Sequence, residues 1–178
     1  MSRFHSPTRR QVCRGLALAG AALILPSAAR AVAVIPGATA DRIVVLKSER
    51  KLTLWRDGRL IATYPVALGG NPVGPKRRQG DKRTPEGRYS IDGMNPRSRY
   101  YRALHISYPN AEDVRLARVA GLAPGSDVEI HGLSRGFEDY DPAAFTYDWT
   151  DGCIAVSNRA IDEIWDRVRV ATVIDILP

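Results

Sequence analysis

The sequence predicts a mainly β domain, a β-sandwich or barrel decorated with a couple of short helices. Short runs rich in β-branched and aromatic residues recur along the chain, and turns rich in Gly and Pro separate them. Helical character is confined to two segments, residues 111–120 and 159–168. Residues 32–178 are enough for one domain with its own core, without support from disulfides or metal ions.

The first half of this domain is expected to form antiparallel strands joined by tight turns. Asp57-Gly58 lies between two β-rich runs and is a strong hairpin signal. The Gly- and Pro-rich segment 69–75 ends that pattern, and Thr84-Pro85-Glu86-Gly87 is a turn that leads into another strand. The strands expected here are residues 42–47, 51–56, 60–68 and 88–91.

The second half of the domain is expected to combine three strands with the two helices. Asn110 is suited to cap the first helix, with Glu112 and Asp113 favourable in its first turn. Asn158 is suited to cap the second helix. The strands expected here are residues 100–108, 128–131 and 172–177.

Residues 1–31 have the composition of a signal peptide. They contain five arginines and no acid, followed by an apolar run at residues 16–25 and the small-residue ending Ala29-Arg30-Ala31. Thr-Arg-Arg at residues 8–10 favours the twin-arginine export route, with the Sec route as the alternative, because the apolar run is common to both. An uncleaved membrane anchor is disfavoured, because the apolar run is well short of the roughly 20 residues that span a bilayer. The sequence thus predicts a protein of the periplasm or cell envelope, with residues 32–178 as its mature domain.

The charge of the chain does not indicate nucleic acid as a partner. The formal net charge is +7, but residues 1–31 supply five of the 26 basic residues, which leaves 21 basic against 19 acidic residues, or +2. The remainder lacks the clustered basic composition of a phosphate-binding surface. Its densest basic stretch, residues 76–83, lies among Gly and Pro, so a solvated loop is expected, with contact to a polyanionic wall as the alternative.

Cys153 is the only cysteine of residues 32–178 and the strongest candidate for chemistry. A thiol attacks as the thiolate, so a thiol acyl-transfer site needs one cysteine and a neighbouring imidazole that takes its proton. His131 ends a predicted strand and is followed by Gly132, which lets another backbone approach. His105 lies in the middle of a predicted strand, where a surface or packed histidine is the expected interpretation and the lining of a groove is the alternative.

The residues before Cys153 favour a reactive thiol over a buried, inert one. The approach to the cysteine is polar and contains a glycine, with the sequence Asp148-Trp149-Thr150-Asp151-Gly152. Gly152 permits close approach of a substrate carbonyl, and the N–H groups of Gly152 and Cys153 are predicted to form an oxyanion hole. Zinc is the weaker alternative, because one Cys and two His without close paired spacing are not typical of a metal site. No metal or other cofactor is therefore expected.

Several segments of the chain together resemble the catalytic domain of the L,D-transpeptidase family (YkuD or ErfK type). The active-site motifs of that family are similar to His131-Gly132 and, after a linker, to Thr150-Asp151-Gly152-Cys153-Ile154 with Val156 and Asn158. Residues 74–89 resemble its Thr-Pro-x-Gly segment, and residues 51–55 resemble its opening hairpin. The resemblance covers nearly all of residues 32–178 in the right order.

This resemblance implies a β-sandwich with a catalytic groove and a cysteine acyltransferase. Cys153 would attack a peptidoglycan stem tetrapeptide at the bond between the L-centre of meso-diaminopimelate and the terminal D-Ala. His131 would be the base and then the acid, oriented by a backbone carbonyl near Gly132 or by a hydroxyl. The acyl group would pass to an amine of a second stem peptide, giving a 3→3 cross-link, or to a lysine of an envelope protein. Carbapenems would be covalent inhibitors.

The resemblance also implies a lid over the groove, formed by residues 133–149, which are rich in aromatic and acidic side chains. The carboxylates of the lid are expected to meet the ammonium groups of the substrate, and they are those of Glu138, Asp139 and Asp141. The side chains expected to bind substrate are those of Tyr147, Trp149, Thr150, Asp151 and Asn158.

Two positions depart from the common family motif. Asp151 stands in place of a histidine, and a carboxylate there is expected to raise the pKa of the cysteine. Ala155 stands in place of an arginine, for which Arg135 or Arg159 is a candidate substitute. Some subgroups of the family carry Thr-Asp-Gly-Cys-Ile without that arginine, and one branch is associated with cleaving links between proteins and peptidoglycan. The alternatives are a cysteine amidase or L,D-carboxypeptidase on the same fold, or a non-catalytic envelope-binding module.

Overall fold

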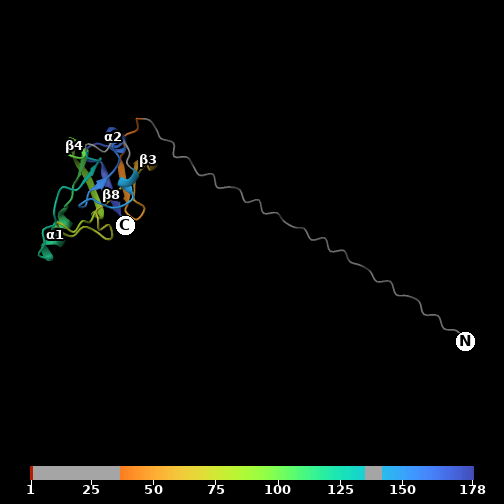
Figure 1. Ribbon diagram of the computed structural model, residues 1–178, viewed down its shortest axis with the longest axis horizontal. Coiled ribbons are helices and arrows are strands. Elements are labelled where there is room, and N and C mark those ends of the chain that lie inside the picture. The colour runs from red at the N-terminus through yellow and green to blue at the C-terminus, as the bar shows by residue number, and fades with distance from the viewer. Residues whose placement is uncertain (2–36, 135–141) are drawn as a thin grey trace. The chain divides into compact units, whose positions relative to one another are not determined.

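Among the residues that the structure describes, eight strands form one sheet in the order β3-β2-β1-β8-β4-β5-β6-β7 (Figure 1). Strands β1 and β8 run parallel, as do β6 and β7, and the other neighbours are antiparallel. This confirms the predicted mainly β fold and its opening three antiparallel strands. The strands are Arg42–Leu46 (β1), Lys51–Arg56 (β2), Arg59–Pro65 (β3), Gly87–Ser98 (β4), Tyr101–Ile106 (β5), Glu129–His131 (β6), Ile154–Ala155 (β7) and Val173–Leu177 (β8).

The computed structural model describes Met1 and residues 37–134 and 142–178. The predicted signal segment lies almost wholly outside the described residues. So does the part of the predicted lid at residues 135–141, with Arg135, Glu138, Asp139 and Asp141. No helix of the described ranges is long and apolar enough to cross a membrane.

Strand β4 carries the chain from one half of the sheet to the other. Its residues 87–90 pair with β8, and its later residues pair with β5 across two register shifts. The prediction that this strand ends at Ile91 is wrong. The shifted register leaves Asp92, Pro96 and Arg97 without partners on β5, so the strand continues through these irregularities without ending.

The two edges of the sheet meet next to the cysteine segment. Ala67, which follows β3, exchanges backbone hydrogen bonds with Ala155 of β7 at 3.0 and 2.9 Å. Gly69 forms a second bridge with Thr150. These bonds hold the loop after β3 against the residues that lead to Cys153.

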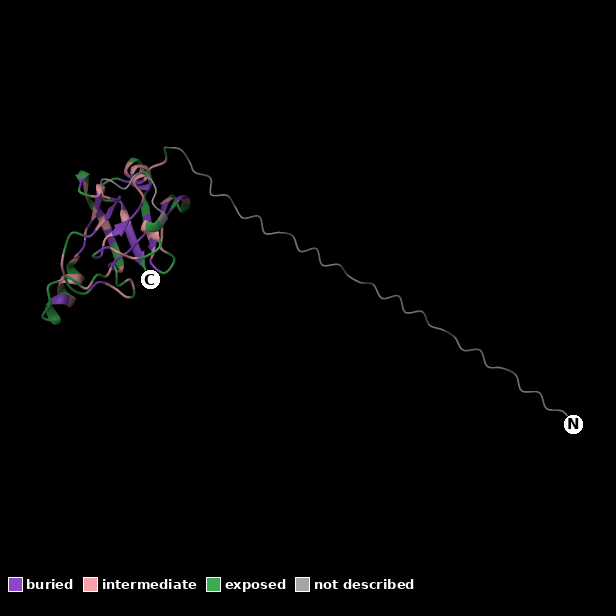
Figure 2. Ribbon diagram, in the orientation of Figure 1, coloured by how far each residue is buried: buried purple, intermediate pink, exposed green. Residues whose placement is uncertain are grey.

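The core is built from alternating positions of the strands, where one face is buried (Figure 2). On β1, for example, Ile43 and Val45 are fully buried and the residues between them are not. The largest fully buried side chains are Ile or Leu, namely Ile43, Leu52, Leu54, Ile61, Leu68, Ile91, Leu104, Ile106, Ile130, Ile154, Ile161 and Ile164.

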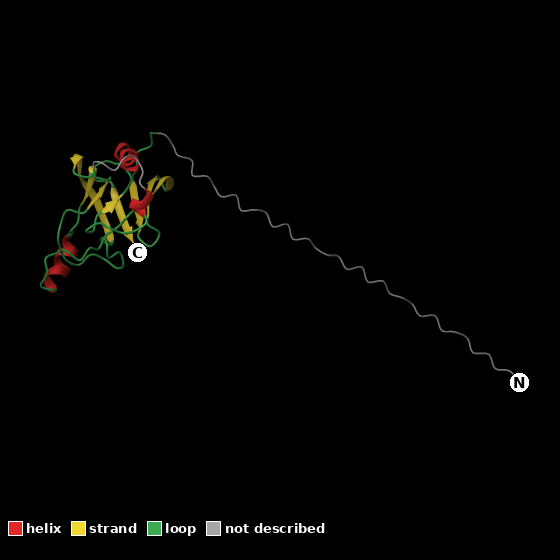
Figure 3. Cartoon of the chain, in the orientation of Figure 1, coloured by secondary structure: helices red, strands yellow, loops and turns green. Residues whose placement is uncertain are grey.

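Helices are few beside the strands (Figure 3). The first helix, α1 (Ala111–Val119), starts where the sequence predicts. The Asn110 side chain accepts hydrogen bonds from the N–H groups of Glu112 and Asp113, and the Asp113 carboxylate accepts one from the Asn110 N–H. This reciprocal pair is a capping box, which satisfies N–H groups that a helix leaves without partners.

The second helix, α2 (Asn158–Arg167), is capped by Ser157 instead of Asn158, so that prediction is wrong by one residue. The Ser157 hydroxyl accepts from the Ala160 N–H at 3.1 Å, while Asn158 is already the first helical residue. The Asn158 side chain has another role, because its Oδ1 accepts from the Leu133 N–H at 2.8 Å.

Candidate active site

Two neighbouring parallel strands bring Cys153 and His131 to the same edge of the sheet. Ile130 pairs with Ile154 and His131 with Ala155, so one further step of this register sets Cys153 beside Glu129. Side chains two residues apart on a strand point to the same face. His131, two residues after Glu129, therefore lies on the face that carries Cys153, one strand away.

His131 is held by contacts on several sides. Its Nδ1 lies 2.7 Å from the Gly132 carbonyl oxygen, which is the orienting carbonyl that the sequence predicts. The ring stacks on Tyr100 with centroids 4.4 Å apart, and the edge of Trp149 lies 6.0 Å from it. With the Nδ1 proton donated to the carbonyl, Nε2 is left with the lone pair that a general base needs.

Burial sets the charge state of this histidine. It lowers the pKa of His131 below the ordinary value of 6.5, and the hydrogen bond to the Gly132 carbonyl opposes that effect only in part. The side chain is almost completely buried. Near neutral pH the imidazole is therefore uncharged and able to accept a proton.

Cys153 is a free thiol, and burial is also the largest influence on its pKa. Burial raises the pKa of the thiol to about 11, while the Glu129 N–H favours the thiolate. The predicted effect of Asp151 is confirmed in direction, although it is smaller than that of burial. The Sγ atom contacts the Asp127 carbonyl oxygen at 3.6 Å. A thiol with this pKa is protonated at neutral pH and needs a base.

The turn that precedes Cys153 is fixed by the Thr150 side chain. Its hydroxyl accepts from the Gly152 N–H at 3.1 Å and donates to the Cys153 carbonyl at 2.8 Å. The substrate-binding role predicted for Thr150 therefore does not fit, because its hydroxyl is buried and used within the turn. The Gly152 N–H is equally committed and is not available for the predicted oxyanion hole. Among the described residues, the Cys153 N–H has no acceptor, so it is the donor left.

Gly152 is required by both its conformation and its surroundings. Its φ is +134°, a region that side chains rarely adopt, and a Cβ there would lie 2.7 Å from the Arg83 carbonyl oxygen. The loop that contains Arg83 thus packs directly on the backbone of the cysteine turn.

Two pockets flank the pair. A pocket of about 240 Å³ on the histidine side is lined by apolar and aromatic side chains, including the predicted binding residues Tyr147 and Trp149. A second pocket, of about 360 Å³, contains Cys153 and Asp151. The first is completed by Tyr100, Leu133, Ser134, Ala143 and Ala144, and the second by Lys76, Gln79, Gly80, Gly125, Ser126, Asp127, Val128 and Gly152.

Lys76 is the charged residue of this site that the sequence did not reveal. Its side chain is only 5% exposed, so the expectation of a solvated loop is wrong for this residue. It pairs with Asp81 at 2.9 Å, and its charge lowers the pKa of Cys153. The signal in the sequence was a lysine and an aspartate five residues apart in a loop rich in Gly, a pattern that also occurs in exposed loops.

Arg159 and His105 are two further residues that the sequence analysis considered for this site. Arg159 lies on α2 with its side chain 84% exposed and pairs with Glu163 at 3.3 Å. His105 lies on β5 with Nδ1 at 2.5 Å from Asp92, and it is paired in register with Glu129. His105 is thus partly exposed on the strand beside the site. The described ranges hold no group of three or more His, Cys, Asp or Glu suited to a metal ion.

Comparison with known proteins gives consistent matches. The family model YkuD, described as the L,D-transpeptidase catalytic domain, matches residues 40–176. A protein of Escherichia coli K12 named "Putative L,D-transpeptidase YafK" is 36% identical over 137 residues, which cover 74% of this chain and 48% of that protein. The chain therefore spans about half the length of the curated relatives that it matches.

Two solved structures with the same fold differ in how similar they are to this chain in sequence and structure. The helical cell shape determining protein Pgp2 of Campylobacter jejuni is 25% identical, with a TM-score of 0.58 over 76% of this chain and 46% of that one. The L,D-transpeptidase LdtMt1 in complex with imipenem is 18% identical, with a TM-score of 0.50 over 76% and 58%. The second likeness concerns the fold alone.

Proposed function

The chain belongs to the L,D-transpeptidase catalytic domain family, and from that membership we propose that it is a cysteine acyltransferase acting on peptidoglycan stem peptides. The observation that carries the proposal is the placement of Cys153 and His131 on one face of two adjacent strands, with the imidazole oriented by the Gly132 carbonyl. This is the nucleophile, base and orienting group that thiol acyl transfer needs.

In the first half of the reaction, His131 Nε2 takes the proton of the thiol as Sγ attacks the carbonyl between diaminopimelate and the terminal D-Ala. The Cys153 N–H stabilises the negative oxygen of the tetrahedral intermediate. The intermediate then collapses to a thioester, and the protonated His131 gives its proton to the amine of the departing D-Ala. The neutral state of both side chains in the free protein fits this order of proton transfers.

In the second half, an amine attacks the thioester carbonyl while His131 removes the proton of that amine. Collapse of this intermediate breaks the C–S bond, and the histidine returns its proton to the thiolate. The acceptor is the amine of a second stem peptide, which gives a 3→3 cross-link, or the lysine of an envelope protein. Pockets on both sides of the pair support a substrate that extends beyond the scissile bond in both directions.

Such a substrate lies in the periplasm or cell envelope, the compartment that the composition of residues 1–31 predicts for this chain. The name of Pgp2 as a helical cell shape determining protein supports a role in the cell wall. We place this chain in the same compartment and process.

Product analysis tests this function. Residues 32–178 are incubated with purified disaccharide-tetrapeptide, alone and with an acceptor stem peptide, and the muropeptides are separated and weighed. We expect cross-linked dimer together with release of D-Ala. Tripeptide without dimer in the presence of the acceptor stem peptide would contradict transfer to a stem-peptide amine. Tripeptide without any adduct when a lysine-containing envelope protein is added as well would contradict transfer to an amine and support a hydrolase on this fold. The Cys153→Ala variant is the control, and turnover by it would exclude both reactions at this thiol.

A further inference from the structure

Lys76 is a buried charge that the mechanism above does not use. Its side chain is 5% exposed and lines the pocket that contains Cys153. A Cβ placed on Gly152 would lie 3.6 Å from the Lys76 Nζ, so the ammonium sits against the cysteine turn. Burying an ammonium is costly unless it is paired and hydrogen-bonded.

The hydrogen bonds of this ammonium are incomplete. Nζ donates to Asp81 Oδ1 at 2.9 Å and to the Arg78 carbonyl at 3.3 Å. A lysine ammonium has three N–H donors. Within the described ranges, the third has no acceptor. One donor of a buried cation therefore remains for a ligand in the pocket.

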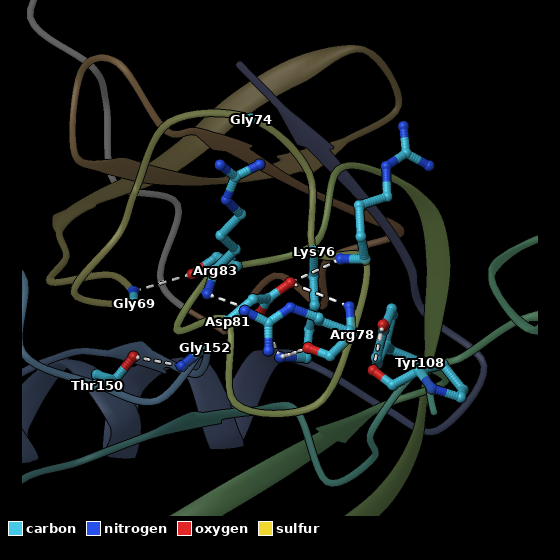
Figure 4. A network of polar contacts seen from close by, with 12 residues as sticks. Gly69, Gly74, Lys76, Arg78, Asp81, Arg83, Tyr108, Thr150 and Gly152 are labelled. Atoms are coloured by element: carbon cyan, nitrogen blue, oxygen red, sulfur yellow. Dashed lines mark hydrogen bonds and ion pairs between the residues drawn. The ribbon is translucent and has the colours of Figure 1, made fainter. Parts of the chain in front are cut away.

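The position of Nζ is fixed by the loop around it (Figure 4). The Asp81 carboxylate accepts hydrogen bonds from the N–H groups of Arg77, Arg78 and Arg83 in addition to Lys76. The two arms of the same loop are joined to each other, because the Asn71 N–H donates to the Lys82 carbonyl. The ammonium is thus held before any ligand arrives, which reduces the entropy lost on binding.

We propose that Lys76 binds the carboxylate of the D-Ala that leaves the stem tetrapeptide. This inference rests on the proposed function and names the group that recognises its substrate. The terminal carboxylate is one residue from the scissile carbonyl, so it reaches the pocket wall next to Cys153. Ala155 provides no cation at the position of the family arginine. The other charged side chains of this pocket, Asp127 and Asp151, are exposed, and solvent screens their repulsion of a carboxylate.

The same contact determines which acceptor is preferred. The acceptor amine takes the place of the amine that left. In diaminopimelate the reacting amine has a carboxylate on the same carbon, as D-Ala has, whereas the side-chain amine of a protein lysine does not. Lys76 therefore favours a stem peptide as acceptor over a protein lysine.

Binding in an inactive background tests the proposal without turnover. In Cys153→Ala protein, calorimetry measures the affinity for disaccharide-tetrapeptide and for its C-terminal amide, in which the carboxylate charge is removed. We expect the acid to bind about 10- to 100-fold more tightly than the amide, the range for a hydrogen bond between charged partners. Adding Lys76→Met lowers the affinity for the acid to that for the amide and leaves the amide unchanged. Lys82→Met removes an exposed lysine of the same loop as a matched control and keeps the preference.

Loss of Lys76 leaves Asp81 without its ion pair, so Lys76→Met/Asp81→Asn is measured beside the single variant, with thermal unfolding of each. Equal affinities for acid and amide in protein that retains Lys76 overturn the inference and leave the proposed function intact. A preference for the acid over the amide that persists in a folded variant without Lys76 also overturns the inference and leaves the proposed function intact. Absence of binding by either peptide overturns the proposed function and this inference with it.

Discussion

The chemistry of this site depends on two side chains that burial keeps uncharged. A thiol whose pKa is about 11 supplies almost no thiolate at neutral pH, and burial lowers the pKa of His131 below 6.5, which favours the uncharged imidazole. A preformed thiolate–imidazolium pair is therefore not the resting state. In the proposed reaction, the proton would therefore move from Sγ to Nε2 only as the thiol attacks, so that proton transfer and attack would be coupled.

The first prediction concerns the thiol alone. The rate at which iodoacetamide alkylates Cys153 should rise with pH through the neutral range and show no plateau below about pH 11, because the thiolate is the reacting form. Mass spectrometry of the quenched protein gives the rate at each pH. A plateau already at neutral pH would show a thiolate stabilised by His131 and would contradict the neutral resting state. The His131→Ala variant separates these cases, because it has no imidazole to form that pair.

The second prediction concerns a reactive inhibitor. A carbapenem is expected to acylate Cys153. The strained amide carbonyl of the carbapenem ring is open to attack by a thiol, and His131 is the base proposed to take the thiol proton. Intact-protein mass spectrometry should show one adduct on the wild type and none on Cys153→Ala. An adduct of equal yield on both proteins would place the acylation at another residue.

At the residue scale, the sequence was sufficient to nominate Cys153 and His131 as candidates and insufficient to predict most of the contacts that hold them. The family resemblance implied a carbonyl near Gly132 or a hydroxyl as the group that orients the histidine ring, and the contact found is with the Gly132 carbonyl. Thr150 was expected to bind substrate, yet its hydroxyl closes the turn, because a local side chain to backbone bond is available before any ligand is. Lys76 was missed because burial of a loop residue depends on what packs over it.

At the scale of elements, the strand that ends at His131 is held by the helix that follows Cys153. Asn158 accepts from the Leu133 N–H, and the Val156 N–H donates to the His131 carbonyl at 2.9 Å. A Cβ on Gly132 would lie 2.5 Å from Asn158 Oδ1. Helix α2 and the histidine turn are thus in direct contact, with no space for a side chain between them.

Gly132→Ala tests this contact. We expect the free energy of unfolding to fall by about 1–3 kcal/mol, the usual cost of overpacking, and turnover to fall because the His131 ring loses its orientation. Urea unfolding measures the first effect. Gly70→Ala is the matched control, because a Cβ there meets its nearest neighbour at 3.6 Å, an ordinary contact. Equal stability of the two variants would contradict close packing at Gly132.

Element boundaries were predicted well where local signals act alone. The Asp57-Gly58 hairpin and the Asn110 cap are local and are confirmed. Strand β4 continues past Ile91 because pairing with β5 absorbs Asp92 and Pro96 as irregularities, which is a property of the partner strand. The start of α2 was misplaced by one residue, since Ser157 and Asn158 are both good caps and the Leu133 N–H engages Asn158.

At the scale of the whole molecule, closure of the sheet brings together loops that are distant in sequence. The loop from Gly69 to Arg83 lies on the cysteine turn because Ala67 pairs with Ala155. Sequence patterns predicted the strands but not this closure, because a pattern of alternating burial does not specify which edges meet. Within that loop, the Asp81 carboxylate accepts hydrogen bonds from several residues, so its protonation is expected to change the stability of the fold.

The stability of the fold should therefore depend on Asp81 in acid. Burial alone would raise the pKa of Asp81, but hydrogen bonds from the Arg77 N–H, the Lys76 ammonium and the N–H groups of Arg78 and Arg83 lower it to about 2. A lowered pKa stabilises the fold above the unfolded value of 3.8, and this contribution disappears as pH falls toward 2.

Urea unfolding of the wild type and Asp81→Asn at several pH values measures that contribution. We expect the wild type to be more stable at pH 6, and the difference between the two proteins to shrink between pH 4 and pH 2. A difference that stays constant over that interval would mean that the carboxylate is not preferentially charged in the folded state.

Transient covalent attachment to Cys153 is the most direct test of the whole account. Wild-type protein is mixed with disaccharide-tetrapeptide, quenched with acid within the first turnovers, and examined by intact and peptide mass spectrometry. We predict a protein adduct with the mass of the substrate minus D-Ala, located on Cys153 and absent from Cys153→Ala. Formation of product by Cys153→Ala, or an adduct on any other residue, would contradict the assignment of Cys153 as the nucleophile.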